Sequence, residues 1–401
     1  MSYKIINNCR VCNSSVIELL DLNDQPLANS FQKDPFDYNK YPLKLMLCQN
    51  CWHTQLSVVV DPNILFKHYL WVSGTSNTML NYWKWFVEEF VQKKYLKCGT
   101  VLDIACNDST LLDSFNTNGW KTYGVDPAEN LIKESSHKPH HLFCNFWNYD
   151  TSNIIKQKCN TFDIITAQNV FAHLDDIHDF LKASKNVMNE TSTLFIQTSQ
   201  KNQIYGNEFD TIYHEHVSFY SISSMIKVAE LNNLYVNNVF YPDIHGTSYL
   251  FELSKVRKKG NILEEYKKEK ISGKYDFTLY EIYKNNCILT KKIVNEKIAK
   301  FKKRNQKIIG FGAAAKATVF INFCDIDLNY IVDENPKKQN LFIPGTNIIV
   351  KDLQHFSNEP QDMVCIIFAW NYSKEITNKI KSNRPNNKDL IISFYPEYKE
   401  H

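Results

Sequence analysis

The sequence lacks the features that mark a membrane or secreted protein. No apolar run among its 401 residues reaches the roughly 20 residues that a membrane-spanning helix requires. The N-terminus, MSYKIINNCR, has no apolar core of the kind that signal peptides carry. We therefore expect a cytoplasmic protein.

A surplus of one charge is also missing. The chain has 46 Lys and Arg residues against 43 Asp and Glu residues, a formal net charge of +3. It shows no compact basic stripe with interleaved aromatic residues, which a dedicated nucleic-acid binder needs, and the short basic run at 255–259 is typical of a solvated linker. We expect neither a nucleic-acid nor a membrane partner, and a monomer or weak oligomer.

The cysteines do not fit a disulfide framework, because their number, 11, is odd and they are spread through long periodic segments. Four of them form two CxxC pairs, Cys9 with Cys12 and Cys48 with Cys51, each in turn-like sequence. Two such knuckles can present four thiolates to one tetrahedral zinc ion. The loop between them is longer than in the commonest zinc ribbons, and two unrelated thiol pairs are the alternative. We predict a closed, structural zinc site in a module at 1–62.

A chain of this length predicts two or three domains. The apolar run Thr100–Ala105 is followed by CNDSTLL, which has the pattern of a turn that opens a helix, and a second short strand, Lys121–Val125, ends at Asp126. In a doubly wound sheet this order places a nucleoside at the carboxyl ends of the first strands, where Asp126 can accept both ribose hydroxyls. Further expected elements of a parallel sheet are strands at 163–166 and 193–197, a helix at 175–188, and a hairpin-like region at 235–253.

The second half of the chain repeats this scheme. Charge-rich sequence after 254 marks a domain boundary, and a long helix at 277–303 leads into a strand at 307–309 and the turn GFGAAAK, Gly310–Lys316. Glycines let backbone amides close on an anion and Lys316 adds charge, so this turn predicts phosphate binding. The strand at 330–332 ends in Asp333, which suits the ribose of a second nucleotide. The turn also fits the loose G-x-G-x-x-A pattern of nicotinamide-dependent oxidoreductases, a weak signal that leaves this alternative open.

The segment Phe209–Ser221, FDTIYHEHVSFYS, concentrates titratable groups in a short window without Gly or Pro. A reaction that moves protons needs an imidazole with partners that orient and tune it, so we interpret this window as catalytic. Its apolar residues also allow an ordinary buried strand or the start of a helix. A metal site at His214 and His216, which would share a face in an extended segment, is the other alternative, although no further ligand cluster stands nearby. The segment Tyr69–Ser76, YLWVSGTS, mixes aromatics with hydroxyls and could cap a ligand pocket.

These motifs, in this order, resemble one enzyme family over essentially the whole chain. The chain is similar to the S-adenosylmethionine-dependent C-methyltransferases that act on nucleotide-linked keto-deoxysugars. The motifs FDTIYHEH and GFGAAAK are the most specific. The others are the paired CxxC knuckles, PLAN at Pro26–Asn29, YPL at Tyr41–Leu43, VLDIACND at Val101–Asp108, NVFAH at Asn169–His173, and VDENPKKQ followed by PGT.

The resemblance implies an α/β fold in three parts. An N-terminal zinc-binding module (1–62) would close over one end of the active site, a Rossmann-like class I methyltransferase domain (63–254) would hold the methyl donor, and a second Rossmann-like domain (255–401) would hold the sugar nucleotide. His216 matches the base that removes the proton beside a ketone, and Tyr213 or His173 could donate to the developing oxyanion. Together with the patterns above, the resemblance predicts a pocket lined by Tyr213, Glu215, His216, Asn169 and His173; donor contacts from Asp103, Ala105, Asn107, Asp108, Asp126, Pro127 and Gln168; and substrate contacts from Tyr69, His245, Gly310, Gly312, Lys316 and Asp333.

The sequence departs from the family at two motifs. Where relatives usually read GSNDG, this chain has Ala105 to Ser109, so both glycines are replaced, and Ser109 adds bulk at a turn where glycine permits positive φ. At His245–Leu250 the chain reads HGTSYL where relatives tend to show HGGSLR, so the arginine is absent. Methylation of a sugar oxygen and a non-catalytic sugar-nucleotide-binding role are therefore further alternatives.

Overall fold

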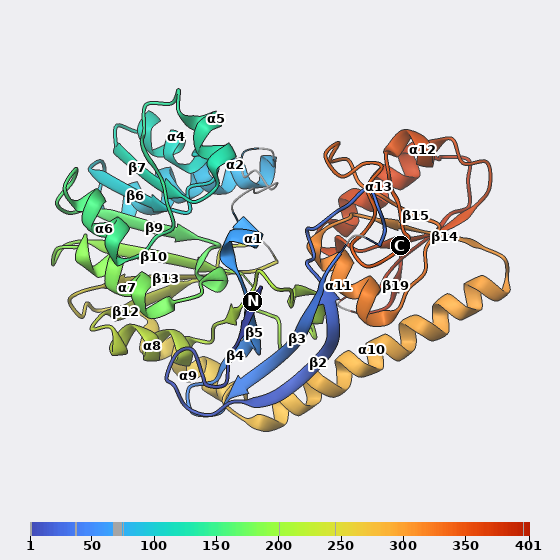
Figure 1. The fold of residues 1–401 in the computed structure, drawn as a ribbon, viewed down its shortest axis with the longest axis horizontal. Coiled ribbons are helices and arrows are strands. Elements are labelled where there is room, and N and C mark those ends of the chain that lie inside the picture. The colour runs from blue at the N-terminus through green and yellow to red at the C-terminus, as the bar shows by residue number, and fades with distance from the viewer. Residues whose placement is uncertain are drawn as a thin grey trace.

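The computed structural model describes residues 2–36, 38–66, 74, 76–199, 201–244, 246–395 and 397–401. Figure 1 shows two α/β lobes, with strands β2 (Ile17–Pro26) and β3 (Lys40–Cys48) between them and the long helix α10 (Phe277–Lys303) beneath. Among the described residues, no helix is long and apolar enough to cross a membrane. The predicted positions Tyr69 and His245 lie outside the described residues.

The N-terminal module is built of two small sheets. In β3 the leucines at alternate positions, Leu43, Leu45 and Leu47, are fully buried, as the period of a half-buried strand requires. Strand β11 (Ser218–Phe219), which belongs to the predicted catalytic window, pairs with the edge of this module. The sheets have the orders β11-β4-β3-β2 and β1-β5, with the remaining strands β4 (His53–Leu56), β1 (Tyr3–Ile5) and β5 (Val58–Val60).

The first lobe is a seven-stranded sheet of order β12-β13-β10-β9-β6-β7-β8. Its central strands are parallel and β13 alone in the sheet runs antiparallel to its neighbours, which confirms the predicted parallel sheet and the hairpin-like region. The inner strands are buried on both faces, as parallel strands between helices are. The strands are β6 (Thr100–Ile104), β7 (Lys121–Asp126), β8 (His141–Cys144), β9 (Ile164–Gln168), β10 (Thr193–Thr198), β12 (Tyr235–Phe240) and β13 (Tyr249–Ser254).

Helices flank this sheet on both faces. The aromatic segment before β6 forms α2 (Asn77–Lys84), a π-helical stretch η2 (Trp85–Val91) and α3 (Gln92–Lys94), and most of its rings belong to the core. The remaining helices of the lobe are α4 (Thr110–Thr117), α5 (Glu129–Ser135), α6 (Tyr149–Lys156), η3 (Phe171–His173), α7 (Ile177–Asn186), η4 (Phe209–Thr211), α8 (Ile222–Leu231) and, packed on α8 and β12, α9 (Ile262–Ile271).

The second lobe is a six-stranded sheet of order β16-β15-β14-β17-β18-β19, parallel except for β19. The fold class is therefore the one predicted: two Rossmann-like α/β lobes joined to an N-terminal module. The elements are β14 (Lys307–Phe311), α11 (Ala315–Cys324), β15 (Tyr330–Val332), β16 (Val350–Lys351), α12 (Leu353–Ser357), β17 (Met363–Ile367), η5 (Trp370–Tyr372), α13 (Ser373–Asn383), β18 (Leu390–Ser393) and β19 (Lys399–Glu400).

Helix α10 ties the three parts together and has the predicted bounds. Asp276 begins it by accepting a hydrogen bond from the Thr278 backbone amide, which caps one of the amides left open at a helix start. Tyr280, near its first turn, stacks on Trp52 of the N-terminal module with ring centroids 5.8 Å apart. Further along, the buried residues of α10 join one apolar core shared by the N-terminal module, the catalytic window and the second lobe. This shared core fixes the relative positions of the three parts.

Candidate active site

A cavity of about 1020 Å³ lies where the three parts of the molecule meet. Its wall combines residues 27–32 of the N-terminal module, helix α1 (Pro62–Phe66), the carboxyl ends of β6, β7 and β9, the catalytic window, and the turn after β14. Ligands of open α/β sheets bind at the carboxyl ends of the strands. Both Rossmann-like lobes present that edge to this one cavity, which makes it the candidate site.

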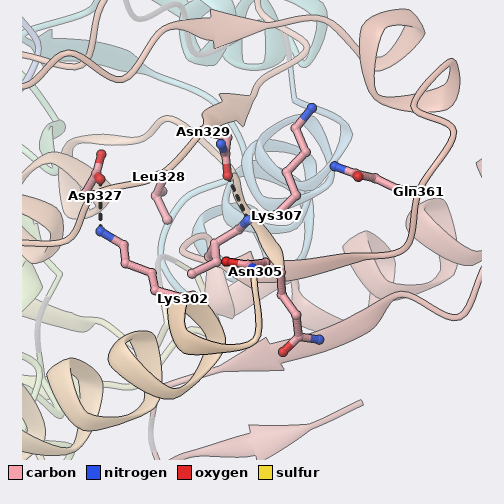
Figure 2. A pocket seen from close by; sticks show the side chains of 9 residues that line it. Lys302, Asn305, Lys307, Asp327, Leu328, Asn329 and Gln361 are labelled. Atoms are coloured by element: carbon pink, nitrogen blue, oxygen red, sulfur yellow. Dashed lines mark hydrogen bonds and ion pairs between the residues drawn. The ribbon is translucent and has the colours of Figure 1, made fainter.

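A second hollow, of about 490 Å³, opens at the amino ends of β14 and β15 (Figure 2). Its charged groups already have partners, since Lys302 Nζ lies 2.9 Å from Asp327 Oδ2 and Lys307 pairs with Glu359. It also lies at the wrong edge of the sheet for the ligands of such folds. We assign no site there.

At the donor end, Asp126 holds the turn that follows β6. Its Oδ2 accepts from the Asn107 amide at 2.9 Å and its Oδ1 from the Ala128 amide at 2.8 Å. Each carboxylate oxygen keeps a lone pair for a further hydrogen bond, so contact with a ribose diol stays possible. The backbone of Ala105, Asn107 and Ser109 is left-handed, with φ of 61°, 51° and 63°. The turn therefore has the shape that glycines would allow, built from residues that have side chains.

Two buried carboxyl groups, whose pKa values are raised, determine the charge at this end of the cavity. Burial raises the pKa of Asp103 well above its usual range, and the charges of Asp126 and Asp108 add to the effect. Burial likewise raises the pKa of Asp126. A cationic ligand would favour the ionised forms of both groups. S-adenosylmethionine carries an ammonium and a sulfonium group, so this donor set fits it.

Of the other residues predicted to contact the methyl donor, some line the cavity and one lies in the turn behind it. Ala105, Pro127 and Gln168 line the cavity, and Gln168 also accepts from the Tyr82 hydroxyl at 3.1 Å. Asp108 does not line it; its Oδ2 accepts from the Gly74 amide at 2.9 Å and from the Thr110 hydroxyl at 2.8 Å. This geometry gives Asp108 a role in shaping the turn, and its contact with the donor stays a prediction.

Ser109→Gly is expected to stabilise the protein by about 1 kcal/mol, because a left-handed residue with a Cβ costs roughly 1–2 kcal/mol and glycine does not pay that cost. Ser114→Gly, in the right-handed interior of α4, is the control and should destabilise by roughly 0.5–1 kcal/mol. Urea unfolding of both variants measures the effects. A Ser109 variant as unstable as the control would contradict the strain inferred at this turn.

The catalytic window forms a turn and not a strand. The 3-10 helix η4 is followed by a turn at His214 and Glu215, and β11 begins only at Ser218. His214 points into the N-terminal module, with Nε2 3.3 Å from the Pro42 carbonyl, and burial lowers its pKa to about 4. His214 is thus a neutral, structural residue that does not share a face with His216, so the geometry offers no support for a metal site at this pair.

His216 lies at the cavity wall in a fixed tautomer. Its Nδ1 is 2.8 Å from the Thr211 carbonyl, which can only accept, so Nδ1 carries the proton. Its Nε2 is 2.7 Å from the Tyr213 hydroxyl and accepts from it. Burial, with the charges of Glu215 and Asp210, raises the pKa of Tyr213 well above its usual range. The arrangement gives a basic Nε2 beside a hydroxyl that stays protonated.

The remaining predicted catalytic residues surround His216. The His173 ring stacks on the His216 ring with centroids 5.1 Å apart. Glu215 Oε1 accepts from Asn29 Nδ2 at 2.6 Å and, because the segment is a turn, Glu215 and His216 both line the cavity. Asn169 follows β9 in a left-handed conformation, and its buried Oδ1 has no partner among the described residues. A buried acceptor without a partner at a cavity wall favours a ligand contact.

At the substrate end, Asp333 repeats the arrangement of Asp126. It accepts from the Ala313 amide at 2.8 Å and from the Asn335 amide at 2.9 Å. Gly312 follows β14 with φ of 87°, as a tight turn requires. Lys316 lines the cavity with Nζ 4.1 Å from the centre of the Trp370 ring, whereas Gly312 and Asp333 stand behind the wall.

The expectation for Gly310 needs correction. It lies inside β14, and a Cβ there would come within 2.8 Å of the Phe368 ring and 2.9 Å of Ile331. The missing side chain therefore serves strand packing.

Sequence reasoning gave no role to several residues that line or support the cavity. Asn29 belongs to the PLAN motif and holds Glu215. Lys338, in VDENPKKQ, lines the cavity and donates to the Ala313 carbonyl at 2.8 Å. Trp370 donates to Asp210 Oδ2 at 2.8 Å. The two motifs could have signalled Asn29 and Lys338, but no local pattern marks Trp370.

Glu208 is a further cavity residue, and burial raises its pKa to about 7, with Lys316 opposing and Asp210 adding to the shift. Because the folded state keeps a proton that the unfolded chain releases above the ordinary glutamate pKa of 4.5, the protein loses stability as pH rises from there through 7. We expect Glu208→Gln to stabilise the ligand-free protein at pH 8, by roughly 1–3 kcal/mol, and to change little near pH 4.5.

Thermal unfolding of the Glu208 variant and wild type across this pH range tests the expectation. Glu296→Gln, at an exposed position of α10, is the control and should leave the pH profile unchanged. A Glu208 variant that parallels wild type at every pH would show that Glu208 titrates as it does in the unfolded chain.

The four knuckle cysteines form a compact cluster. Cys9 and Cys51 Sγ are 3.6 Å apart, as are Cys12 and Cys48 Sγ, and all four sulfurs lie within 4.8 Å of one another. These distances exclude disulfides, which need about 2.05 Å. A zinc ion bonded to four sulfurs at about 2.3 Å puts them about 3.8 Å apart, so the cluster fits zinc. Among the described residues it is the one group of at least three His, Cys, Asp or Glu side chains placed to hold a metal.

Family models match three consecutive parts of the chain, and the third begins within the first lobe, before β13. Family models match a zinc binding domain at residues 9–66, a methyltransferase domain at 78–239 and a C-methyltransferase C-terminal domain at 243–394. The predicted resemblance, the zinc module and the use of S-adenosylmethionine are thereby confirmed.

The matches to curated relatives are of two kinds, one over nearly the whole chain and others over about a quarter to a third of it. The C-methyltransferase NovU of Streptomyces niveus is 23% identical over 400 residues, which cover 96% of this chain and 95% of NovU. The ubiquinone biosynthesis O-methyltransferase of Glaesserella parasuis serovar 5 is 32% identical over 104 residues, 24% of this chain and 44% of that enzyme. Among solved structures, one match is the magnesium protoporphyrin IX methyltransferase of Synechocystis PCC 6803. The match covers 44% of this chain and 79% of that enzyme's chain, with 13% identity and a TM-score of 0.33.

Proposed function

Since the chain is an S-adenosylmethionine-dependent methyltransferase, we propose that it transfers the methyl group to a carbon atom beside the ketone of a nucleotide-linked keto sugar. The observation that carries the proposal is His216, whose Nδ1 is committed to the Thr211 carbonyl and whose Nε2 stands at the cavity wall as a base. A carbon beside a ketone becomes nucleophilic only when a base removes its proton, and Nε2 is placed to act as that base.

In this mechanism the two lobes hold two ligands against one another. Asp103, Asp126 and Gln168 would hold the methyl donor, which supplies an electrophilic methyl group at its sulfonium. The amides of the turn after Gly312, with Lys316 and Lys338, would hold the phosphates of the sugar nucleotide, because turn amides and cations suit such anions.

The catalytic turn then acts on the sugar between them. His216 Nε2 removes the proton beside the ketone. The Tyr213 hydroxyl, kept protonated by its burial, turns from Nε2 to donate to the oxygen on which negative charge develops. His173 limits the tilt of the His216 ring by stacking on it. The donor would then supply its methyl group to the carbon so activated, provided that the two lobes hold the ligands next to one another.

The proposal is tested by incubating the purified protein with isotopically labelled methyl donor and a panel of nucleotide-linked sugars, each keto sugar matched by the alcohol at the same position. We expect methylated product only from keto sugars, with the label bonded to carbon in the product's NMR spectrum. A label bonded to oxygen, or transfer to the matched alcohols, would replace the proposal with O-methylation. No transfer to any nucleotide-linked sugar would place the acceptor in another class.

A further inference from the structure

We propose that Arg10, which stands between the zinc ligands Cys9 and Cys12, is a positioning residue that fixes the loop carrying His173 and the turn carrying His216. The zinc knuckle would thus support the chemistry through one side chain, beyond holding its own module together. The expected effect on turnover rests on the proposed role of His216. The expected effect on the backbone does not.

The Arg10 side chain donates hydrogen bonds to the loop that follows His173. Its Nη2 donates to the Leu174 carbonyl and, at 2.7 Å, to the Asp175 carbonyl. Its own carbonyl lies 3.1 Å from His178 Nε2, at the start of α7. Both the side chain and the backbone of the knuckle therefore contact one short loop, across more than 160 residues of sequence.

A short series of backbone hydrogen bonds continues from that loop to the catalytic turn. The Ala172 carbonyl accepts from the Val217 amide at 2.8 Å, and the Val217 carbonyl accepts from the Leu56 amide at 2.9 Å. Val217 directly follows His216. Leu56 ends β4, and β4 begins at His53, just after the second zinc knuckle.

A side-chain bridge closes this arrangement into a ring. Gln55 in β4 accepts from the Arg10 amide at 2.8 Å and donates to the Asn8 carbonyl at 3.0 Å. The ring runs from the first knuckle through the His173 loop and Val217 into β4, and returns to the first knuckle through Gln55. His173 and His216 face each other inside it, with stacked rings.

Arginine suits this position because Nη2, which donates to both carbonyls, belongs to a rigid planar group, whereas a lysine ammonium is a compact charge on a flexible stem. Without it, two partly buried carbonyls would lose their donor, and the loop would open to reach water. The knuckle sequence could hold zinc with other residues between its cysteines, so the contact is separable from metal binding.

The test compares Arg10→Met with Lys4→Met. Methionine keeps the apolar stem and removes the donors. Lys4 is the matched control, because its Nζ pairs with Asp175 Oδ1 at 2.5 Å on the exposed side of the same loop. Hydrogen exchange reports on the amides of His173 and Val217, which are bonded to Val170 and Ala172. Zinc content, donor affinity and turnover are measured on the same samples.

We expect Arg10→Met to retain one zinc per chain and donor affinity, while its His173 and Val217 amides exchange about tenfold faster and kcat falls by about the same factor, as loss of a buried hydrogen-bond donor allows. Lys4→Met should match wild type in all four measurements. Arg10→Lys, which keeps the charge and hydrogen-bond donors on a more flexible stem, should lie between them and remains informative if the methionine variant misfolds.

Unchanged exchange in Arg10→Met with zinc bound would overturn the inference, as would equal changes in Lys4→Met. Faster exchange with unchanged kcat would overturn the claim that Arg10 supports catalysis. Failure of the proposed function looks different: wild type would then methylate no nucleotide-linked keto sugar, while the exchange difference between the two variants would persist.

Discussion

Replacing His216 with asparagine is expected to lower kcat by about a hundred- to ten-thousandfold, the range that a general base contributes. Asparagine can place its amide nitrogen near the position of Nδ1 and keep the hydrogen bond to the Thr211 carbonyl, which is 2.8 Å long in the wild type. It has no group at the position of Nε2. The turn should therefore keep its shape while the base is lost.

Steady-state kinetics with saturating donor measure this loss, and calorimetry with the donor alone serves as the control, since the donor-end carboxylates are untouched. Glu215→Gln is the matched variant, because Glu215 lines the same cavity and its amide form can still accept from Asn29. We expect it to lower kcat far less. A Glu215 variant more damaged than the His216 variant would move the base to the neighbouring residue.

Removal of zinc should have the largest effect on stability. Structural zinc sites bind with about 10–16 kcal/mol, as much as the whole stability of a typical domain. Cys9, Cys48 and Cys51 of the N-terminal module are buried against the apolar core of the first lobe. Loss of the metal would therefore disturb the contact between module and lobe as well as the module itself. We expect Cys48→Ala to lose zinc, unfold the N-terminal module and abolish turnover.

Elemental analysis, limited proteolysis and thermal unfolding check this expectation. Cys98→Ala is the control, since this thiol is exposed and far from the cluster in sequence, and it should behave as wild type. Treatment of wild type with a chelator should reproduce the Cys48 variant. Wild-type protein that contains no zinc, or a Cys48 variant that keeps the metal and its stability, would contradict the assignment.

Regular elements could be predicted because their signals are local. The apolar run of β6, the short strand β7 with its terminal acid and the long helix α10 each need only neighbouring residues to be recognised. The two CxxC pairs likewise predicted a cluster that the structure brings together. The order strand, turn, helix, strand, acid predicted that Asp126 and Asp333 lie at equivalent places, and both hold the turn of their lobe with two amides.

The details of the site depended on tertiary contacts that no local pattern contains. The window around His216 has the composition of a strand, but its pairing with β4 begins only at Ser218, so the preceding residues form a turn and His214 faces away. Gly310 looks like part of a phosphate turn, yet the neighbouring strand and Phe368 use its missing side chain. Arg10 and Asn29 acquire roles only because distant segments meet at the cavity.

The most direct test of the proposed chemistry separates proton removal from methyl transfer. The keto-sugar nucleotide is incubated with enzyme in heavy water without methyl donor, and deuterium at the carbon beside the ketone is followed by NMR. We predict incorporation with wild type, slower incorporation with Glu215→Gln and none with His216→Asn. Full incorporation with His216→Asn, or none with wild type that still methylates the same sugar, would contradict His216 as the base that makes the carbon nucleophile.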